Sequence, residues 1–425
     1  MTSRWLILAD DLTGAADCAI AFARRGLTAS VGWQGVEAGW ETDVLAIDAD
    51  SRRLPPGEAG ARHAALLRAR HRPGAGLIKK IDSTLRGQPA AELAATLAAL
   101  REAGRPSLAI LAPAFPATGR TTVSGRVHLD GAPLEGTPLW ARDHSYPSAH
   151  LAEVLGTAGL SARHLPLDLL RAGDAALAAA LRDALAAGFD AVVADAVLPG
   201  DLDALARASL PLAEQALWVG SGGIAAALAA ALPGGAPDSL PARPAPRGGA
   251  LVVVGSVAEA SRLAARRAEE EGAAAFDVPP ALLRAGPADP RWAPLSEGIA
   301  VTLAAGRDAL VRIAAEPDAD LAGGAALAEA LASLLAPAAR QMGALFATGG
   351  ETACALLGHL GVTGIRLLEE IEPGVPLGVT QGALEVPVMT KAGAFGDAGT
   401  ILRSLARLRD PGPARPHALP QESAP

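Results

Sequence analysis

The chain has 425 residues, of which 50% are hydrophobic and 3% aromatic, and its formal net charge is -8. Its length suggests two domains with cores of Ala, Leu and Val, and its acidity argues against a general binder of nucleic acid or membrane surfaces. Two cysteines, Cys18 and Cys354, are too few for a disulfide framework, and neither a signal-peptide layout nor a membrane-spanning run is found, so we predict a cytoplasmic protein.

Apolar, strand-like runs alternate with Ala- and Leu-rich helical stretches along the chain. The runs are WLILAD, VLAID, GLIKKID, SLAILAP, AVVAD and LWVGS, followed later by ALVVVGS, GIAVTL and ALFATGG. This alternation predicts an α/β protein with mostly parallel sheets flanked by helices. Between the two groups lies a segment rich in Pro and Gly, and the chain ends in a Pro-rich stretch. We therefore predict domains at 1–232 and 249–409, a linker at 233–248 and a disordered tail at 410–425.

The first predicted strand ends in two adjacent carboxylates, Asp10 and Asp11, and Thr13 follows before a helix. Adjacent carboxylates repel each other unless a cation or hydrogen-bond donors lie between them, which favours a binding site over a simple helix cap. Haloacid-dehalogenase-like phosphatases also begin with a strand and Asp-x-Asp-x-Thr. Here Ala9 stands where their nucleophile must be, so we set that alternative aside.

The stretch GLIKKIDSTLRG contains two of only three lysines among 37 basic residues. In a strand Lys79 and Lys80 point to opposite faces, and Lys80 shares the face of Asp82. We therefore place Lys80 in the site and expect Lys79 to tolerate arginine. The loop that follows offers hydroxyl groups and a guanidinium that could bind a carboxylate through two N–H groups. The predicted substrate-binding residues are Ser83, Thr84 and Arg86 of this loop, together with Asp10 and Thr13 after the first strand.

A long segment, APAFPATGRTTVSGRVHLDGAPL, is predicted to be an irregular substrate loop in which Gly119 and Arg120 contact an anion. After the linker, three strands each lead through glycine into a helix, at Gly255–Ser256, Thr348–Thr352 and Lys391–Gly396. Such turns bind phosphate through backbone N–H groups and the helix dipole. Neither a Walker A sequence nor a Gly-x-Gly-x-x-Gly fingerprint is present, and the histidines show no metal-ligand spacing, so no metal ligands are assigned.

Taken together, the motifs ADDLTGAAD, KKIDSTLRG with Glu92, PAFPATGRTTVSG, GSGG, GGETA and KAGAFG resemble the four-carbon acid sugar kinase family from residue 9 to about 400. The resemblance implies an ATP-dependent kinase that phosphorylates threonate, erythronate or 3-oxo-tetronate at the 4-hydroxyl group. It also implies an N-terminal sugar-acid domain, a C-terminal nucleotide domain and an active site in the cleft between them. The family's usual polar residues are replaced by Gln88, Ala392 and Ala394, which could alter affinity or substrate choice.

For a kinase, we expect ATP and Mg²⁺ as cofactors and a carboxylate beside the attacking hydroxyl group. The predicted catalytic residues are Asp11, Lys80 and Asp82, with Asp10 anchoring the turn. The resemblance and the glycine turns together predict the nucleotide contacts, which are Ser256, Gly349, Gly350, Glu351, Thr352, Lys391, Gly393 and Gly396.

Two alternatives stay open: a kinase of another small hydroxy acid and a non-catalytic sugar-acid-binding protein. We expect small-molecule partners, with neither nucleic acid nor membrane among them, and a homo-oligomer is compatible with the sequence. The sequence does not distinguish between the stereoisomers of the substrate.

Overall fold

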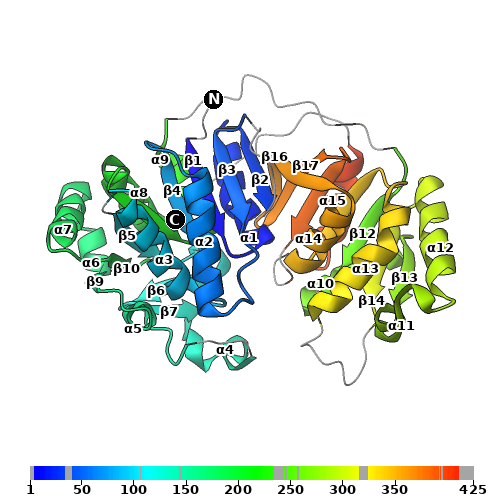
Figure 1. Ribbon diagram of the computed structural model, residues 1–425, viewed down its shortest axis with the longest axis horizontal. Coiled ribbons are helices and arrows are strands. Elements are labelled where there is room, and N and C mark those ends of the chain that lie inside the picture. The colour runs from blue at the N-terminus through cyan, green and yellow to red at the C-terminus, as the bar shows by residue number, and fades with distance from the viewer. Residues whose placement is uncertain are drawn as a thin grey trace, which may run out of the picture. The chain divides into compact units, whose positions relative to one another are not determined.

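The computed structural model describes residues 4–33, 41–105, 107–142, 146–233, 244, 247–255, 258–314, 324–391, 393 and 396–410. Its contacts divide the chain into two compact units, Met1–Asp238 and Ser239–Pro425. In each unit a sheet carries helices on both faces (Figure 1). Most of the predicted linker, the tail from residue 411 and Ser256 lie outside the described residues. No helix in the described part of the chain is long and apolar enough to cross a membrane.

The sheet of the first unit is parallel, with the strand order β2-β3-β1-β4-β11-β5-β10-β9. Ala9, the last residue of β1, pairs with Asp48 at the end of β3 and with Lys80 at the end of β4. The loops that follow these three strands therefore leave from one edge of the sheet. The strands are β1 Trp5–Ala9, β2 Ala29–Trp33, β3 Val44–Asp48, β4 Gly76–Lys80, β5 Leu108–Ala112, β9 Ala162–Leu165, β10 Ala191–Ala194 and β11 Ala216–Gly220.

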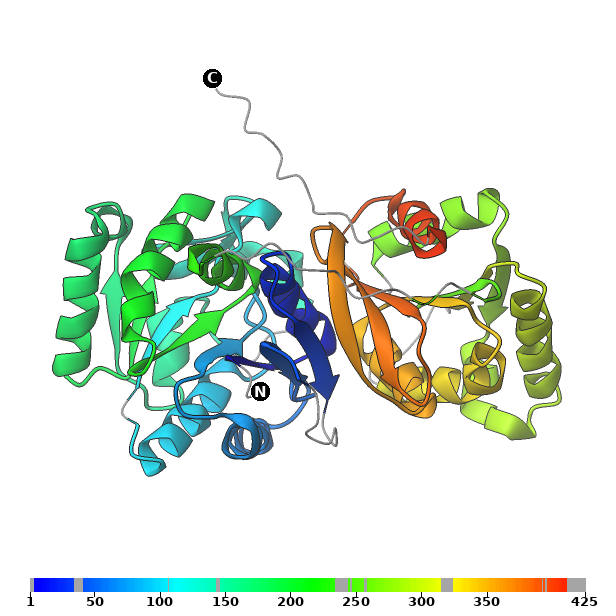
Figure 2. The same ribbon diagram turned by 90° about the horizontal axis from the view of Figure 1, so that it is seen from above.

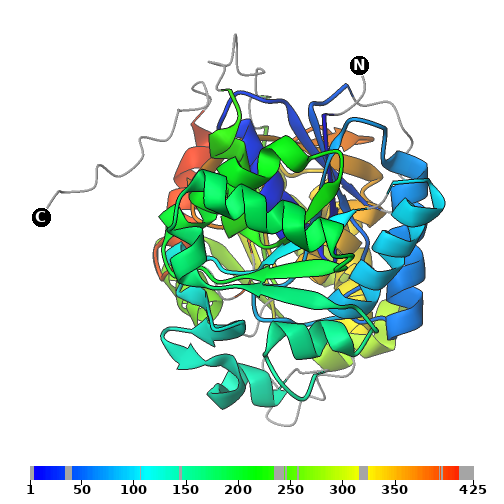
Figure 3. The same cartoon turned by 90° about the vertical axis from the view of Figure 1, so that its left-hand side faces the viewer.

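Helices cover both faces of this sheet, which buries its strands and explains their continuous apolar sequences. One face carries α1 Leu12–Ala23, α7 Asp174–Ala186, α8 Pro199–Ser209 and α9 Gly222–Ala231. The other carries α2 Pro56–Arg70, α3 Pro89–Glu102 and α5 Leu151–Gly156, and Figure 3 gives the unit from the side of β9 and α7. Two short helices, α4 Pro138–Arg142 and α6 Leu167–Leu170, complete this part.

The segment predicted to be an irregular substrate loop is instead a small antiparallel sheet. It contains β6 Arg120–Val123, β7 Arg126–Leu129 and β8 Ala132–Pro133. Ser124 and Gly125, both with positive φ, form the two-residue turn between β6 and β7. The prediction of an irregular loop was wrong because the Thr-Thr-Val and Arg-Val-His-Leu runs form a hairpin whose turn residues suit such a connection.

The second unit contains a mixed sheet with the order β13-β14-β12-β15-β18-β17-β16. Pairing is parallel from β13 to β18, whereas β17 is antiparallel to both β18 and β16, an arrangement that the sequence pattern did not indicate. The strands are β12 Ala250–Val254, β13 Ala274–Val278, β14 Ala309–Ile313, β15 Ala344–Thr348, β16 Val362–Glu372, β17 Val375–Gly382 and β18 Pro387–Lys391.

Its helices also lie on two faces, and Figure 2 shows the red α15 and the yellow α13 on opposite sides of the strands. The helices are α10 Glu259–Glu270, α11 Pro280–Ala285, α12 Trp292–Ala304, α13 Gly324–Ala339, α14 Gly350–His359 and α15 Thr400–Arg409. The predicted strand GIAVTL is wrong, since it lies within α12. Ile299 and Leu303 are buried four residues apart, whereas Val301 between them is 63% exposed, which is a helical pattern.

Candidate active site

The carboxyl ends of β1, β3 and β4 bring a charged cluster together in the first unit. Open α/β sheets bind ligands at this edge, where loops meet the N-termini of helices. The cluster contains predicted residues from the loops after β1 and β4 and from the end of β4 itself, and one residue that the sequence reasoning missed. We refer to it as the acidic–basic cluster, defined as Asp10, Asp11, Arg52, Lys80, Asp82 and Arg86.

Asp11, rather than Asp10, anchors the turn into α1. Its side chain caps the helix by accepting from the Gly14 N–H at 3.0 Å and from the Thr13 hydroxyl group at 2.7 Å. Asp10 was expected to have this anchoring role, but its side chain points to Arg52, and its carbonyl oxygen accepts from the N–H groups of Ser51 and Arg52. The pair therefore includes a helix cap and is also part of a charged cluster, whereas ligand binding by this cluster stays a prediction.

Arg52 is the residue that the sequence reasoning missed. Its Nε donates to Asp10 Oδ2 at 2.7 Å, and its Nη1 and Nη2 each lie 2.9 Å from an oxygen of Asp11. One guanidinium group thus neutralises the repulsion between the two adjacent carboxylates. The available signal was positional, because Arg52 follows shortly after VLAID, the strand that becomes the neighbour of β1.

Lys80 approaches the same carboxylates from β4, with Nζ 3.7 Å from Asp10 Oδ1 and 4.0 Å from Asp11 Oδ1. Gly14 leaves room for it, since a Cβ atom at residue 14 would lie 2.3 Å from Lys80 Nζ. Lys79 points to the other face, as predicted, where Nζ lies 2.6 Å from Glu92 Oε2 and the side chain is fully buried. The expected tolerance of arginine at Lys79 conflicts with this enclosure.

The basic groups keep the carboxylate of Asp10 ionised. Burial by itself raises the pKa of Asp10, but Arg52 and Lys80 together lower it to about 2. Burial opposes the charge of Lys80 as well, yet Asp10 and Asp11 raise the pKa of Lys80 above its ordinary value. The cluster therefore holds fixed charges of both signs at neutral pH, which suits the binding of a polar anion.

Asp82 and Arg86 form a second pair within the loop after β4. Arg86 Nε lies 2.5 Å from Asp82 Oδ2, Arg86 Nη2 lies 3.3 Å from Asp82 Oδ1, and the Thr84 hydroxyl group donates to Asp82 at 2.7 Å. Burial raises the pKa of Asp82, but Arg86 and Arg52 bring it well below its ordinary value. The Nε and Nη2 groups of Arg86, which were expected to bind the substrate carboxylate, thus bind Asp82. Ser83, next to Asp82 in the chain, is half-buried.

Arg120 comes from the hairpin and lies close enough to this pair to interact electrostatically with Asp82 and Arg86. Burial lowers its pKa, and the carboxylates of Asp130 and Asp82 oppose that effect. Its Nη1 donates to the carbonyl oxygen of Thr118. The adjacent Gly119 has a φ of +77°, and a Cβ atom there would lie 2.0 Å from Asp130 Oδ1, so glycine is required at this turn.

In the second unit, the glycine turns after β12, β15 and β18 lie at one edge because these strands are neighbours. The Gly349 N–H donates to the carbonyl oxygen of Lys391, and a Cβ atom at Gly255 would lie 2.1 Å from the Thr352 hydroxyl oxygen. Gly349 precedes α14 with a φ of +90°, and Gly350, Glu351 and Thr352 form the first turn of that helix. The turns are thus packed closely enough to need glycine.

Lys391 ends β18 and is almost completely buried. Its Nζ lies 3.2 Å from both the Ser261 hydroxyl oxygen and the carbonyl oxygen of Gly393. Burial lowers the pKa of Lys391 to about 8, although the carboxylate of Glu372 opposes this effect. Gly396, with a φ of +77°, packs against Thr400 at the start of α15. Ala392 and Ala394 lie outside the described residues, so their effect on nucleotide binding stays untested.

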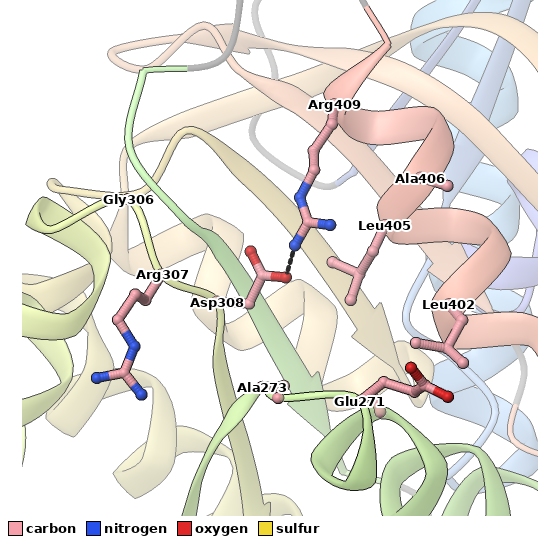
Figure 4. Close-up of a pocket in the computed structure, with 11 residues that line it drawn as sticks. Glu271, Ala273, Gly306, Arg307, Asp308, Leu402, Leu405, Ala406 and Arg409 are labelled. Atoms are coloured by element: carbon pink, nitrogen blue, oxygen red, sulfur yellow. Dashed lines mark hydrogen bonds and ion pairs between the residues drawn. The ribbon is translucent and has the colours of Figure 1, made fainter.

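A separate hollow lies at the opposite edge of this sheet, where Ala273 and Asp308 precede β13 and β14 (Figure 4). Arg409 and Asp308 point toward each other there and form an ion pair, whereas Arg307 points away. None of the predicted site residues lines this hollow. Within the described ranges, no group of three His, Cys, Asp or Glu side chains is placed to hold a metal ion.

Comparison with known proteins matches the two units separately. Residues 5–228 match the sugar-binding N-terminal domain, and residues 251–401 match the nucleotide-binding C-terminal domain. The chain is 47% identical to a D-threonate kinase from Cupriavidus necator, over 93% of this chain and 96% of that protein. The chain belongs to the four-carbon acid sugar kinase family. As a family member it is a sugar-acid kinase with a nucleotide-binding domain, which confirms the predicted class of enzyme.

Two further similarities are informative. The chain is 31% identical to a 3-oxo-tetronate kinase of the same Cupriavidus necator strain, over 92% of this chain and 93% of that protein. A solved structure described as a putative tRNA synthase from Salmonella typhimurium matches with a TM-score of 0.79 and 23% identity, over 94% of this chain and 98% of that one. That identity supports a shared fold alone. Membership of the kinase family rules out the phosphatase and the non-catalytic binding protein.

Proposed function

We propose that this chain phosphorylates D-threonate at its 4-hydroxyl group, with ATP as the phosphoryl donor. The comparison within one organism supports this substrate, since identity is 47% to the D-threonate kinase and 31% to the 3-oxo-tetronate kinase. The observation that carries the proposed chemistry is the Arg52 bridge to Asp10 and Asp11 at the carboxyl edge of the sugar-binding domain. This bridge holds two adjacent carboxylates where a bound hydroxyl group could approach.

Within the pair, Asp11 is the carboxylate proposed to meet the attacking hydroxyl group. Its side chain is 18% exposed, whereas that of Asp10 is 2% exposed. Phosphoryl transfer depends mainly on positioning and charge, so an ionised carboxylate that orients the hydroxyl group and accepts its proton is sufficient. Lys80 then acts by holding the two carboxylates in place, because its ammonium group is buried beneath Gly14.

Arg86 and Arg120 are proposed to bind the carboxylate of the sugar acid. Asp82 engages Arg86 through Nε and Nη2, and we assign Nη1 to the carboxylate of the substrate. Asp82 is therefore proposed to orient Arg86. Arg120 supplies a second positive charge from the hairpin, near the same pair. Thr13, Ser83 and Thr84 are the hydroxyl groups at this edge that can bond the polyol chain.

ATP is proposed to bind the glycine turns of the second unit, with Lys391 as the positive charge nearest them. The matched nucleotide-binding domain and the neighbouring strands β12, β15 and β18 support this position. Transfer from ATP on one domain to an acid on the other requires the two carboxyl edges to meet in the reacting complex, with water excluded. Mg²⁺ stays a prediction, and the roles proposed here involve no metal.

A substrate panel tests the proposal directly. ATP consumption would be measured with D-threonate, L-threonate, D-erythronate and 3-oxo-tetronate, and the phosphorylated carbon would be identified by NMR. We expect the highest kcat/KM with D-threonate and a product phosphorylated at O4. A higher kcat/KM with D-erythronate or 3-oxo-tetronate would refute the proposed substrate, and phosphorylation at another oxygen would refute the proposed position.

A further inference from the structure

Four polar side chains form a buried group next to the acidic–basic cluster. We call it the buried tetrad, and each of its members is at most 1% exposed: Ser51, His63, Lys79 and Glu92. They come from the loop after β3, from α2, from β4 and from α3. Glu92 is the centre, since its carboxylate accepts from the Ser51 hydroxyl group at 2.6 Å and lies 2.6 Å from Lys79 Nζ. None of the roles proposed for the reaction uses this group.

The hydrogen atoms of the tetrad can be assigned from its geometry. Ser51 has one hydroxyl hydrogen and donates it to Glu92, so at its other contact it accepts from His63 Nε2 at 3.0 Å. Burial, with the charge of Lys79 adding to it, lowers the pKa of His63 to about 3, so the imidazole is neutral at pH 7. The tetrad therefore holds one buried ion pair between Lys79 and Glu92, together with two neutral members.

Stability alone gives a weak reason for such a group. Replacing a buried ion pair by apolar residues of similar volume is often neutral or stabilising. A buried network of hydrogen bonds and an ion pair does, however, fix the positions of the segments that it joins, although His63 Nδ1 has no hydrogen-bond partner here. The segments joined here are the loop after β3 and the end of β4.

Those two segments carry two basic residues of the acidic–basic cluster, Arg52 and Lys80, each directly after a member of the tetrad. Ser51 precedes Arg52, and Lys79 precedes Lys80 and donates from Nζ to the Lys80 carbonyl oxygen at 3.0 Å. Glu92 bonds Ser51 and Lys79 at the same time, so it fixes the backbone of both basic residues relative to each other. The tetrad lies on one face of β4, and the carboxylates that the basic residues hold lie on the other.

We propose that the buried tetrad is a positioning device that sets Arg52 and Lys80 on the Asp10–Asp11 pair and thereby controls the rate of phosphoryl transfer. The inference rests on the proposed function of that pair. Catalytic groups lose activity steeply when they are misplaced by even about 1 Å. Loss of a tetrad contact should therefore lower kcat strongly, whereas the thermal stability of the fold should fall only slightly.

Ser51→Ala tests this inference, because it removes one hydroxyl group and leaves the Lys79–Glu92 pair in place. The matched control is Ser209→Ala, which removes a buried hydroxyl group that accepts from Trp218 Nε1 at 2.8 Å in the same unit. For both variants we would measure kcat, the KM values for D-threonate and ATP, and the midpoint of thermal unfolding. We expect kcat of Ser51→Ala to fall roughly tenfold to a hundredfold with the KM for ATP unchanged, and kcat of Ser209→Ala to equal that of the wild type.

Two more variants separate the possible outcomes. Asp11→Asn tests the proposed function itself: if it keeps wild-type kcat, the assignment of the carboxylate pair fails. If Asp11→Asn is inactive while Ser51→Ala keeps wild-type kcat, only the positioning inference is overturned. Ser51→Cys retains a weaker donor, so its kcat should lie between those of the alanine variant and the wild type. Should Ser51→Ala fail to fold, a wild-type kcat for Ser51→Cys would overturn the inference.

Discussion

Gly14→Ala is expected to damage catalysis without unfolding the protein. Gly14 lies in the first turn of α1, directly over the ammonium group of Lys80. A Cβ atom there would be 2.3 Å from Lys80 Nζ and 2.6 Å from Asp11 Oδ1, whereas ordinary van der Waals contact begins at 3.4 Å. The ammonium group is the flexible end of its side chain and must therefore retreat by about 1 Å, away from the carboxylates that it neutralises.

The energetic effect can be worked from the two ion-pair distances. Lys80 Nζ lies 3.7 Å from Asp10 and 4.0 Å from Asp11. With an effective dielectric constant of about 20, a retreat of about 1 Å weakens each attraction by about 1 kcal/mol, or about 2 kcal/mol in total. Alanine regains about 1 kcal/mol from its higher helix propensity. The net loss of stability is then about 1 kcal/mol, whereas kcat should fall roughly tenfold or more because the carboxylates lose their alignment.

Steady-state kinetics with saturating ATP and D-threonate, together with thermal unfolding, would measure both effects. Gly200→Ala is the matched control, since Gly200 lies in the first turn of α8 and a Cβ atom there meets nothing within 4 Å. That variant should keep wild-type kcat and gain up to about 1 kcal/mol of stability. Wild-type kcat and KM in Gly14→Ala would refute the placement of Lys80 as a group that must stay in contact with the carboxylates.

Three further predictions concern the basic residues. Arg52→Lys should lower kcat/KM for D-threonate at least about tenfold, because one ammonium group cannot reproduce a bridge to two carboxylates; unchanged kinetics would show that the bridge is dispensable. Lys79→Arg should lower the midpoint of thermal unfolding, since overpacking a filled core costs about 1–3 kcal/mol. An unchanged midpoint for this variant would contradict the enclosure of the Lys79 side chain. Lys80→Arg should mainly lower kcat. The depressed pKa of Lys391, about 8, means that its positive charge is lost as the pH rises through that value. ATP affinity measured by calorimetry should therefore weaken between pH 7 and pH 9. If the ATP affinity of a Lys391→Met variant falls by the same factor over that pH range, the effect belongs to another group.

Local features of the molecule could be read from the sequence because their causes lie within a few residues. Apolar runs that end in Asp10 or Lys80 indicated parallel strands, and alternation in β4 separated the faces of Lys79 and Lys80 correctly. The glycine turns of the second unit were found in the same way, since a positive φ such as that of Gly349 calls for glycine directly. The prediction of secondary structure failed for a short apolar segment, GIAVTL, which is helical. Its burial recurs at Ile299 and Leu303, four residues apart, and a stretch of six residues contains that helical spacing only once.

The sequence by itself therefore determined the family, the α/β class and most of the charged residues at the strand ends. Only the tertiary structure decided which of those charges meet. Arg52 contacts Asp10 across 42 residues because β3 happens to be the neighbour of β1, and Glu92 reaches Lys79 and Ser51 because α3 packs over β4. Strand order and helix packing depend on how the whole chain buries its apolar surface, so no short stretch of sequence specifies them.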